Sequence, residues 1–292
     1  MRTPGQFVRT ASPEALFAIA GISQYTGAVV AVNLFEEVRP ATVAWFRVMS
    51  AAVLLLAISW RHQSGGWTRR ELVSAATFGI ATAAMNLFFY LAIDRLPLGK
   101  SVVIEFIGPI AVAAAFTRSV RNSVALLLAA LGVITLSGLE IGGEPLGILY
   151  IFGASAMWAA YIILGRRVAQ LERGVAGLGV GLAIGSMVIM PFGVAGSGEV
   201  FGNGRLLLLC IAVGALSSAL GYGIDQAVMR RIPVRRFAVL LALLPVSAMV
   251  LGYIALDQQP TAADLFGAAL VIAGVLLQER DELPATLEDV PA

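Results

Sequence analysis

The chain has 292 residues, of which 59% are hydrophobic and 13% are charged, and its formal net charge is +2. A typical soluble domain is about 45–50% apolar and about 25% charged, so this composition excludes a soluble enzyme with an ordinary polar surface. The small net charge argues against a nucleic-acid partner. A single cysteine, Cys210, allows neither an internal disulfide nor a zinc site.

Ten apolar segments follow one another along the chain, and most have the length that a lipid core requires. The segments are 14–34, 41–60, 71–93, 98–117, 122–139, 146–166, 174–195, 205–229, 235–255 and 262–278. Because unpaired backbone groups are not tolerated in lipid, these segments predict an all-α membrane protein with ten transmembrane helices. The first segment follows two arginines, as a signal peptide would, but it is long and contains Gln24 and Asn33. We therefore expect it to be a retained helix.

The basic residues are distributed unevenly between the two sides of the predicted bundle. If the N-terminus lies inside and the spans alternate, fifteen arginines fall on the inner side and four basic residues on the outer side. Lys and Arg are enriched in cytoplasmic loops of membrane proteins. The asymmetry predicts a multi-pass protein of the inner (plasma) membrane, with the N- and C-termini in the cytoplasm.

The two halves of the chain share a spacing of prolines. Pro97 and Pro109 are twelve residues apart, and so are Pro233 and Pro245, at an offset of 136 residues. Two prolines at equal spacing can arise by chance, but the topology is consistent with a repeat. Because each half holds five helices, the second half would enter the membrane upside down, as in the inverted repeats of secondary transporters.

Three ionisable residues lie inside apolar segments, where each costs roughly 2.5–3.5 kcal/mol at a helix centre. Arg47 and Glu105 lie at similar depth below the outer ends of their segments, so one interpretation is a structural ion pair. The functional interpretation places Glu105 in a transport cavity, where it binds an ammonium group or a proton. Asp225 lies nearer the inner end, where it could line the cavity or meet Arg230 or Arg231.

Uncharged polar side chains accompany these charges. Asn86 and Tyr90 are four residues apart and share a helix face, and Gln24 lies in the first segment. These groups could hydrogen-bond a polar ligand or join helices to one another. Trp158 and Tyr161 follow a helical stripe that packing alone would explain, or that would form a wall of the binding site.

Two further patterns concern packing and chemistry. Gly177, Gly181 and Gly185 are spaced by four and predict a close approach between helices. No cluster of metal ligands and no nucleophile–base set is found in the sequence. We therefore expect no catalytic residue, no metal, no cofactor and no enzymatic activity.

The stretch MNLFFYLAIDRLPLGKSVVIEFIGPIAVA, at 85–113, resembles the third and fourth helices of a known family. This family is the EamA-type branch of the drug/metabolite transporter superfamily, and the match is nearest to its exporters of threonine and homoserine. The element Glu105-Phe106-x-Gly108-Pro109 is the most specific part of the match. Weaker similarity covers nearly the whole chain, including Arg47 and Asp225.

The resemblance implies ten helices in two inverted repeats, a first EamA-type unit at 14–139 and a second at 146–278. It implies a central cavity lined by helices one, three, four, six, eight and nine, and a peripheral second helix that carries Arg47. The substrate-binding residues expected from the residues and the resemblance together are Glu105, Asn86, Tyr90, Trp158, Gln24 and Asp225. Structural or gating roles are expected for Arg47, Pro97, Pro109, Pro233 and Pro245.

The expected function is export of small amino acids similar to threonine or homoserine, or of related polar metabolites, by alternating access with proton antiport. Efflux of drugs or cations is one alternative, and a membrane partner protein that does not transport is another. The expected partners are the small-molecule substrate and the lipid bilayer, with no nucleic acid; a homodimer is left open.

Overall fold

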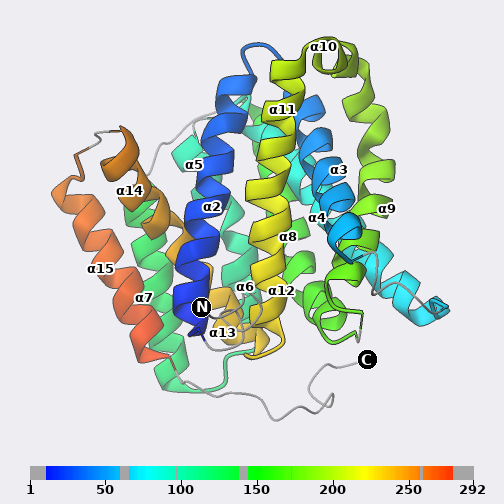
Figure 1. The fold of residues 1–292 in the computed structure, drawn as a ribbon. Coiled ribbons are helices and arrows are strands. Elements are labelled where there is room, and N and C mark those ends of the chain that lie inside the picture. The colour runs from blue at the N-terminus through cyan, green and yellow to red at the C-terminus, as the bar shows by residue number, and fades with distance from the viewer. Residues whose placement is uncertain are drawn as a thin grey trace, which may run out of the picture.

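The computed structural model describes residues 11–59, 66–96, 98–137, 144–171, 173–256 and 259–278. Within these ranges the regular secondary structure is entirely helical (Figure 1). We call the face at which α2 begins and α15 ends the terminal face; it is the lower face in Figure 1. The other end of the bundle is the opposite face. The predicted all-α membrane fold is confirmed.

Ten spans are present in the part of the chain that the structure describes, and their ends lie within three residues of the predicted segments. The spans are α2 (Pro13–Leu34), α3 (Pro40–Ser59), α4 (Arg69–Ile93), α5 (Leu98–Glu105) with α6 (Ile107–Ala115), α7 (Val120–Ser137), α8 (Pro145–Ala169), α9 (Val175–Gly193), α11 (Gly204–Val213) with a π-helical stretch (Gly214–Leu220) and α12 (Gly221–Met229), α13 (Val234–Leu240) with α14 (Leu243–Leu256), and α15 (Ala262–Leu277). A 3-10 turn (Val194–Gly196) and α10 (Ser197–Gly202) extend α9.

The starts of α4 and α15 are set by local polar contacts. Thr68 caps α4: its hydroxyl accepts from the Glu71 backbone at 3.2 Å, and the Glu71 carboxylate accepts from the Thr68 backbone at 2.8 Å. Thr261 and Asp264 form the same reciprocal cap on α15. Such capping boxes satisfy N–H donors that the first helical turn leaves unpaired, so α4 and α15 each begin at a defined residue.

The fourth and ninth spans are interrupted at equivalent points, between α5 and α6 and between α13 and α14. Pro109 has no N–H to donate to the Glu105 carbonyl four residues earlier, and Pro245 likewise cannot donate to the Leu241 carbonyl. A proline inside a helix removes this bond and kinks the helix. Both interruptions therefore follow from the two prolines that are 136 residues apart.

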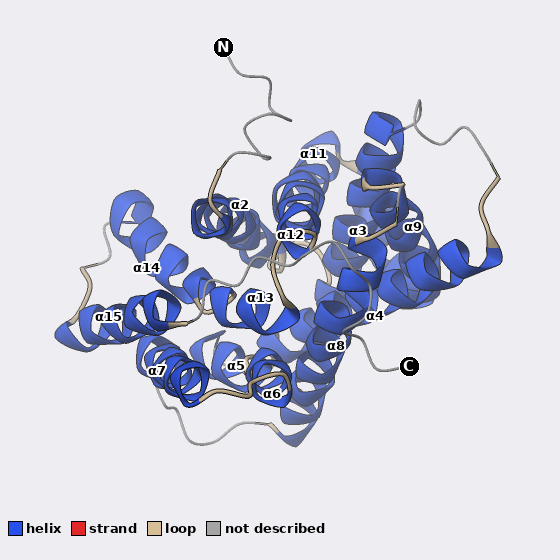
Figure 2. Cartoon of the chain, turned by 90° about the horizontal axis from the view of Figure 1, so that it is seen from below, coloured by secondary structure: helices blue, strands red, loops and turns tan. Residues whose placement is uncertain are grey.

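The packing of the first half is repeated in the second half. The third span, α4, packs on α8 and α9, while the eighth span, formed by α11, the π-helical stretch and α12, packs on α2 and α3. Across the halves, α7 packs on α15, α3 on α9 and α6 on α13 (Figure 2). Since α4 begins and α12 ends on the terminal face, the two repeats are inverted. Pro233 precedes α13, and Pro97 lies outside the described residues.

The predicted glycine contact joins α4 to α9. A Cβ added to Gly181 would lie 2.5 Å from the Ala75 carbonyl oxygen, and one added to Gly185 would strike the Gly79 backbone. One added to Gly79 would strike the Gly181 backbone in turn. The close approach is confirmed for Gly181 and Gly185, whereas a Cβ on Gly177 would meet side chains at ordinary contact distance only.

Candidate functional site

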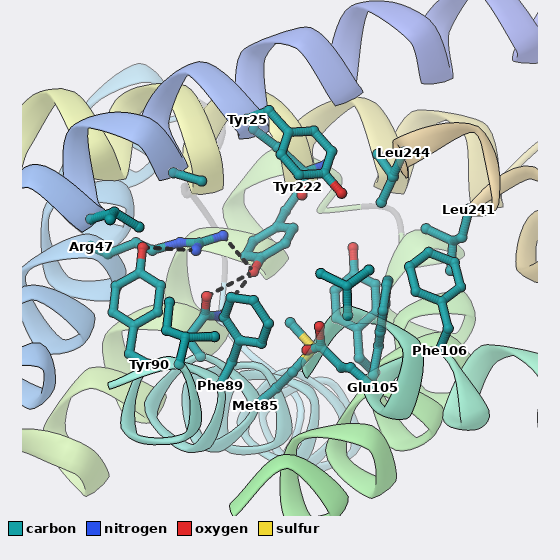
Figure 3. Close-up of a pocket in the computed structure, with 18 of the residues that line it drawn as sticks. Tyr25, Arg47, Met85, Phe89, Tyr90, Glu105, Phe106, Tyr222, Leu241 and Leu244 are labelled. Carbon is teal, nitrogen blue, oxygen red and sulfur yellow. Dashed lines mark hydrogen bonds between the residues drawn. The ribbon is translucent and has the colours of Figure 1, made fainter. Parts of the chain in front are cut away.

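A cavity of about 280 Å³ lies between the two repeats (Figure 3). On α2 and α4 it is lined by residues 24–33 and 85–93, which lie in the halves of these helices farther from the terminal face. On these two helices the cavity therefore extends from the middle of the bundle toward the opposite face, while on α12 it reaches Asp225, four residues before the end of that helix. Its polar lining residues are Gln24, Tyr25, Asn33, Arg47, Asn86, Tyr90, Glu105, Trp158, Tyr161, Tyr222 and Asp225.

Four side chains join α2 to α13 between the cavity and the terminal face. Arg236 donates to the Glu14 carboxylate at 2.7 Å, and the rings of Phe17 and Phe237 meet edge to face with centroids 5.1 Å apart. Arg236 and both rings are buried. We call these four residues the terminal seal, because they link α2 to α13 on this side of the cavity.

Arg47 reaches the cavity from α3, although the resemblance implies a peripheral second helix. Its Nε donates to the Ser218 hydroxyl at 2.9 Å, its Nη1 to Tyr90 Oη at 3.1 Å and its Nη2 to Tyr222 Oη at 3.2 Å. The backbone of α3 approaches the eighth span closely because Gly214 has no side chain; a Cβ there would lie 2.6 Å from the Arg47 carbonyl oxygen. The expectation of a peripheral Arg47 is therefore wrong.

Asn86 and Tyr222 are bonded to each other across the two repeats. Asn86 Nδ2 donates to Tyr222 Oη at 2.9 Å, and Tyr222 Oη lies 3.2 Å from the Asn86 Oδ1 acceptor. These residues are 136 apart, so they occupy equivalent positions in the repeats. Tyr25 and Tyr161, which also line the cavity, have the same offset. No local sequence pattern marks Tyr222 as a site residue, but the 136-residue offset of the prolines relates it to Asn86.

Glu105 ends α5 at the interruption of the fourth span, lines the cavity and is 9% exposed. Among the described residues no basic group lies within ion-pair distance of its carboxylate. The ion pair with Arg47 is therefore not formed. In Figure 3 the two side chains enter the cavity from different sides, Arg47 from the left and Glu105 from the lower right.

Asp225 is 2% exposed and lines the cavity from α12. Its Oδ2 accepts from Tyr161 Oη at 2.8 Å, while its Oδ1 has no hydrogen-bond partner in the described part of the chain. Arg230 and Arg231 donate to backbone carbonyls, those of Leu171 and Ala11. The alternative in which Asp225 meets these arginines at the membrane interface is wrong.

The remaining predicted site residues lie on the same walls. Trp158 meets Phe106 edge to face, with ring centroids 4.8 Å apart. Gln24 packs against Gly221, and its Nε2 donor finds no acceptor among the residues described. The cavity thus combines an aromatic wall with two residues, Gln24 and Asp225, that each bury one polar atom without a hydrogen-bond partner among the residues described.

Comparisons with known proteins agree with this architecture. Residues 145–278 match the EamA-like transporter family. The threonine/homoserine exporter RhtA of Escherichia coli strain K12 is 32% identical over 266 residues, which cover 89% of each chain. The RhtA of Salmonella typhimurium strain LT2 is 32% identical over 270 residues, also 89% of each chain.

Two more distant likenesses cover nearly the whole chain. The uncharacterized inner membrane transporter YicL of Salmonella typhimurium strain LT2 is 22% identical over 282 residues, or 90% of this chain and 93% of that protein. A protein of known crystal structure shares the fold with a TM-score of 0.72 at 19% identity, over 91% of this chain and 98% of the other. These findings place the chain among transporters rather than enzymes: it belongs to the EamA-like transporter family.

Proposed function

We propose that the protein exports small amino acids similar to threonine or homoserine across the inner membrane by alternating access. The observation that carries this proposal is the cavity between the inverted repeats. Its walls present both acidic and hydrogen-bonding side chains to a ligand. Its volume of about 280 Å³ lies just below the roughly 300–1,000 Å³ of pockets for drug-sized ligands. A small substrate therefore suits it better than a large drug. The names of the RhtA relatives support the same substrate class.

The terminal face is proposed to be cytoplasmic, because basic residues gather there. The described arginines near this face are Arg69, Arg70, Arg118, Arg121, Arg166, Arg167, Arg173, Arg230, Arg231, Arg235 and Arg236. Those near the opposite face are Arg39, Arg95 and Arg205. In this orientation the cavity opens outward and the terminal seal closes its cytoplasmic end.

The substrate-binding residues that we propose are Glu105, Asn86, Tyr90, Trp158, Gln24 and Asp225. Glu105 would bind the substrate ammonium when the cavity faces the cytoplasm. After the substrate leaves on the outside, a proton taken from outside would neutralise the emptied carboxylate and be released inside, which gives antiport. The interruptions that follow Glu105 and Leu240, created by Pro109 and Pro245, would let the spans bend as the cavity changes sides.

Export is tested in cells loaded with a threonine-containing dipeptide. Cells that overproduce the protein should release threonine or homoserine faster than cells that carry an empty vector. If no amino acid is released faster than from the empty-vector cells, the proposal is contradicted. If the cells instead gain resistance to cationic drugs without faster amino-acid release, the drug-efflux alternative is favoured.

Alternating access predicts that weakening the terminal seal hides the cavity from the outside. Ala28 lines the cavity, so Ala28→Cys in a Cys210→Ser background provides a thiol for a membrane-impermeant maleimide. Adding Arg236→Gln removes the bond to Glu14. We expect this bond to stabilise the outward-open state by about 1 kcal/mol, or roughly fivefold in the equilibrium constant between the two states. Labelling of whole cells should therefore slow, by as much as that factor where the outward-open state is the less populated one.

The matched control is Arg205→Gln, which breaks the ion pair with Glu37 on the opposite face. Both partners are largely exposed, with side-chain exposures of 64% and 43%, so this pair contributes little. Labelling of Ala28→Cys should stay unchanged in this variant. An equal or faster rate with Arg236→Gln would count against the terminal seal as the cytoplasmic gate.

A further inference from the structure

We infer that Arg47 is the residue that binds the substrate carboxylate, so that the cavity requires a ligand with separate negative and positive ends. This inference deepens the proposed function and rests on it for the identity of the substrate. Arg47 would hold the carboxylate on the α3 side, and Glu105 would hold the ammonium group from the fourth span. A compound with an ammonium group but no carboxylate would then bind poorly.

The first observation is the set of partners around the guanidinium of Arg47, a residue that lines the cavity and is 8% exposed. Its three hydrogen bonds go to neutral hydroxyl oxygens, those of Ser218, Tyr90 and Tyr222. No carboxylate among the described residues lies within ion-pair distance of it. A guanidinium has five N–H donors, so two remain for a ligand. A buried charge in a membrane is costly without a partner, and an anionic ligand would supply one.

The second observation is the separation of the opposite charges. Arg47 and Glu105 enter one cavity from different sides without pairing to each other (Figure 3). A direct ion pair would neutralise both groups and remove them from recognition. Because they stay apart, a zwitterion between them can meet each of its charges with the opposite charge. Charge-assisted hydrogen bonds of this kind are about twice as strong as neutral ones.

The third observation is that the guanidinium is held in place before a ligand arrives. Its carbon lies 5.6 Å from the centroid of the Tyr90 ring and 5.9 Å from that of the Tyr222 ring. Tyr222 is fixed in turn by Asn86 at 2.9 Å. In the described part of the chain, the Tyr90 hydroxyl accepts from Arg47 and donates to no other group, so its proton is available to a carboxylate. A positioned arginine with a neighbouring phenol forms a ready carboxylate subsite.

The test uses the purified full-length protein in proteoliposomes, with uptake of labelled L-threonine by counterflow. The competitors are unlabelled L-threonine and L-threonine methyl ester, which keeps the ammonium and hydroxyl groups but has no carboxylate. The ester should compete about 10- to 100-fold more weakly, as expected for loss of a hydrogen-bonded charge. Arg47→Gln should weaken competition by threonine by a similar factor and abolish the difference between threonine and its ester. Arg47→Lys should restore part of that difference.

The control variant is Arg166→Gln. Arg166 is also a buried arginine, but it donates to the Ile232 carbonyl at 2.8 Å and does not line the cavity. Its replacement can lower the overall rate, yet the ratio between ester and threonine should stay at the wild-type value. This ratio separates recognition by Arg47 from simple damage to the fold.

The outcomes separate this inference from the proposed function. If wild-type protein transports threonine and the ester competes equally well, the inference is wrong and the exporter proposal stands. If threonine is not transported, the carboxylate subsite is tested by ligand binding instead. The measurement is the rise in the thermal unfolding midpoint caused by threonine, by 2-hydroxybutyrate and by the ester. Stabilisation by either carboxylate that Arg47→Gln removes supports the carboxylate subsite, even though the exporter proposal fails. Stabilisation by the ester alone, or by none of the three, overturns the inference.

Discussion

Glu105→Gln is expected to lower the export rate of threonine at least tenfold while leaving the fold intact. Glutamine has nearly the same shape, so the packing around the interruption of the fourth span is kept. The substitution removes the negative charge that faces the cavity, and a hydrogen bond to a charged group is worth about 1.5–3 kcal/mol. Initial efflux rates from proteoliposomes and the thermal unfolding midpoint in detergent measure the two parts of this prediction.

Glu36→Gln is the matched control, because Glu36 is exposed in the turn between α2 and α3 and lies outside the cavity lining. The export rate of Glu36→Gln should equal that of the wild type. A normal rate for Glu105→Gln would show that the assigned role is wrong even if export itself is established. If Asp225→Asn then stops export, the charged partner of the substrate is the acid of α12 instead.

Gly79→Ala is expected to destabilise the protein by about 1–3 kcal/mol, the usual cost of inserting a methyl group into a packed contact. The added Cβ would strike the Gly181 backbone, which cannot move aside as a flexible side chain can. The crossing of α4 and α9 would have to widen, and with it one wall of the bundle. Thermal unfolding in detergent should show a lower midpoint and a smaller yield of folded protein.

Gly223→Ala tests whether this loss comes from the contact or from changing any glycine in a membrane helix. Gly223 lies within α12, and a Cβ added there meets nothing within 4 Å. Alanine also favours helix formation over glycine by about 1 kcal/mol. The midpoint of this variant should be unchanged or higher. Equal losses in the two variants would show that the α4–α9 crossing tolerates a methyl group.

Most of the fold could be predicted because lipid imposes length and composition on each span. The segment predicted at 205–229 corresponds to α11, the π-helical stretch and α12, although no sequence signal indicated the π-helical turns. The division into units at 14–139 and 146–278 stays a prediction. Structural or gating roles were expected for Pro109 and Pro245, and the spans are interrupted three to four residues before each.

The site was harder to predict because the lining of a cavity depends on how helices rotate and how closely they approach. Asn86 and Glu105 stood out as polar groups in apolar segments. The reach of Arg47 into the cavity depends on Gly214 in a span that is remote in sequence, and no local pattern around Arg47 reports it. Tyr222 looked like an ordinary aromatic residue, and only its offset from Asn86 marks it.

The bond between Asn86 and Tyr222 links two positions that correspond in the two repeats. Suppose that the two repeats exchange conformations when the cavity turns inward. A contact between two positions that do not correspond is then lost, and the contact between their counterparts in the other repeats forms on the other side of the membrane. A contact between corresponding positions is its own image, so the exchange maps it onto itself. The terminal seal must break and be replaced in each cycle, whereas the Asn86–Tyr222 bond can persist throughout. This pair would then be a fixed contact at the axis about which the two halves of the protein rotate.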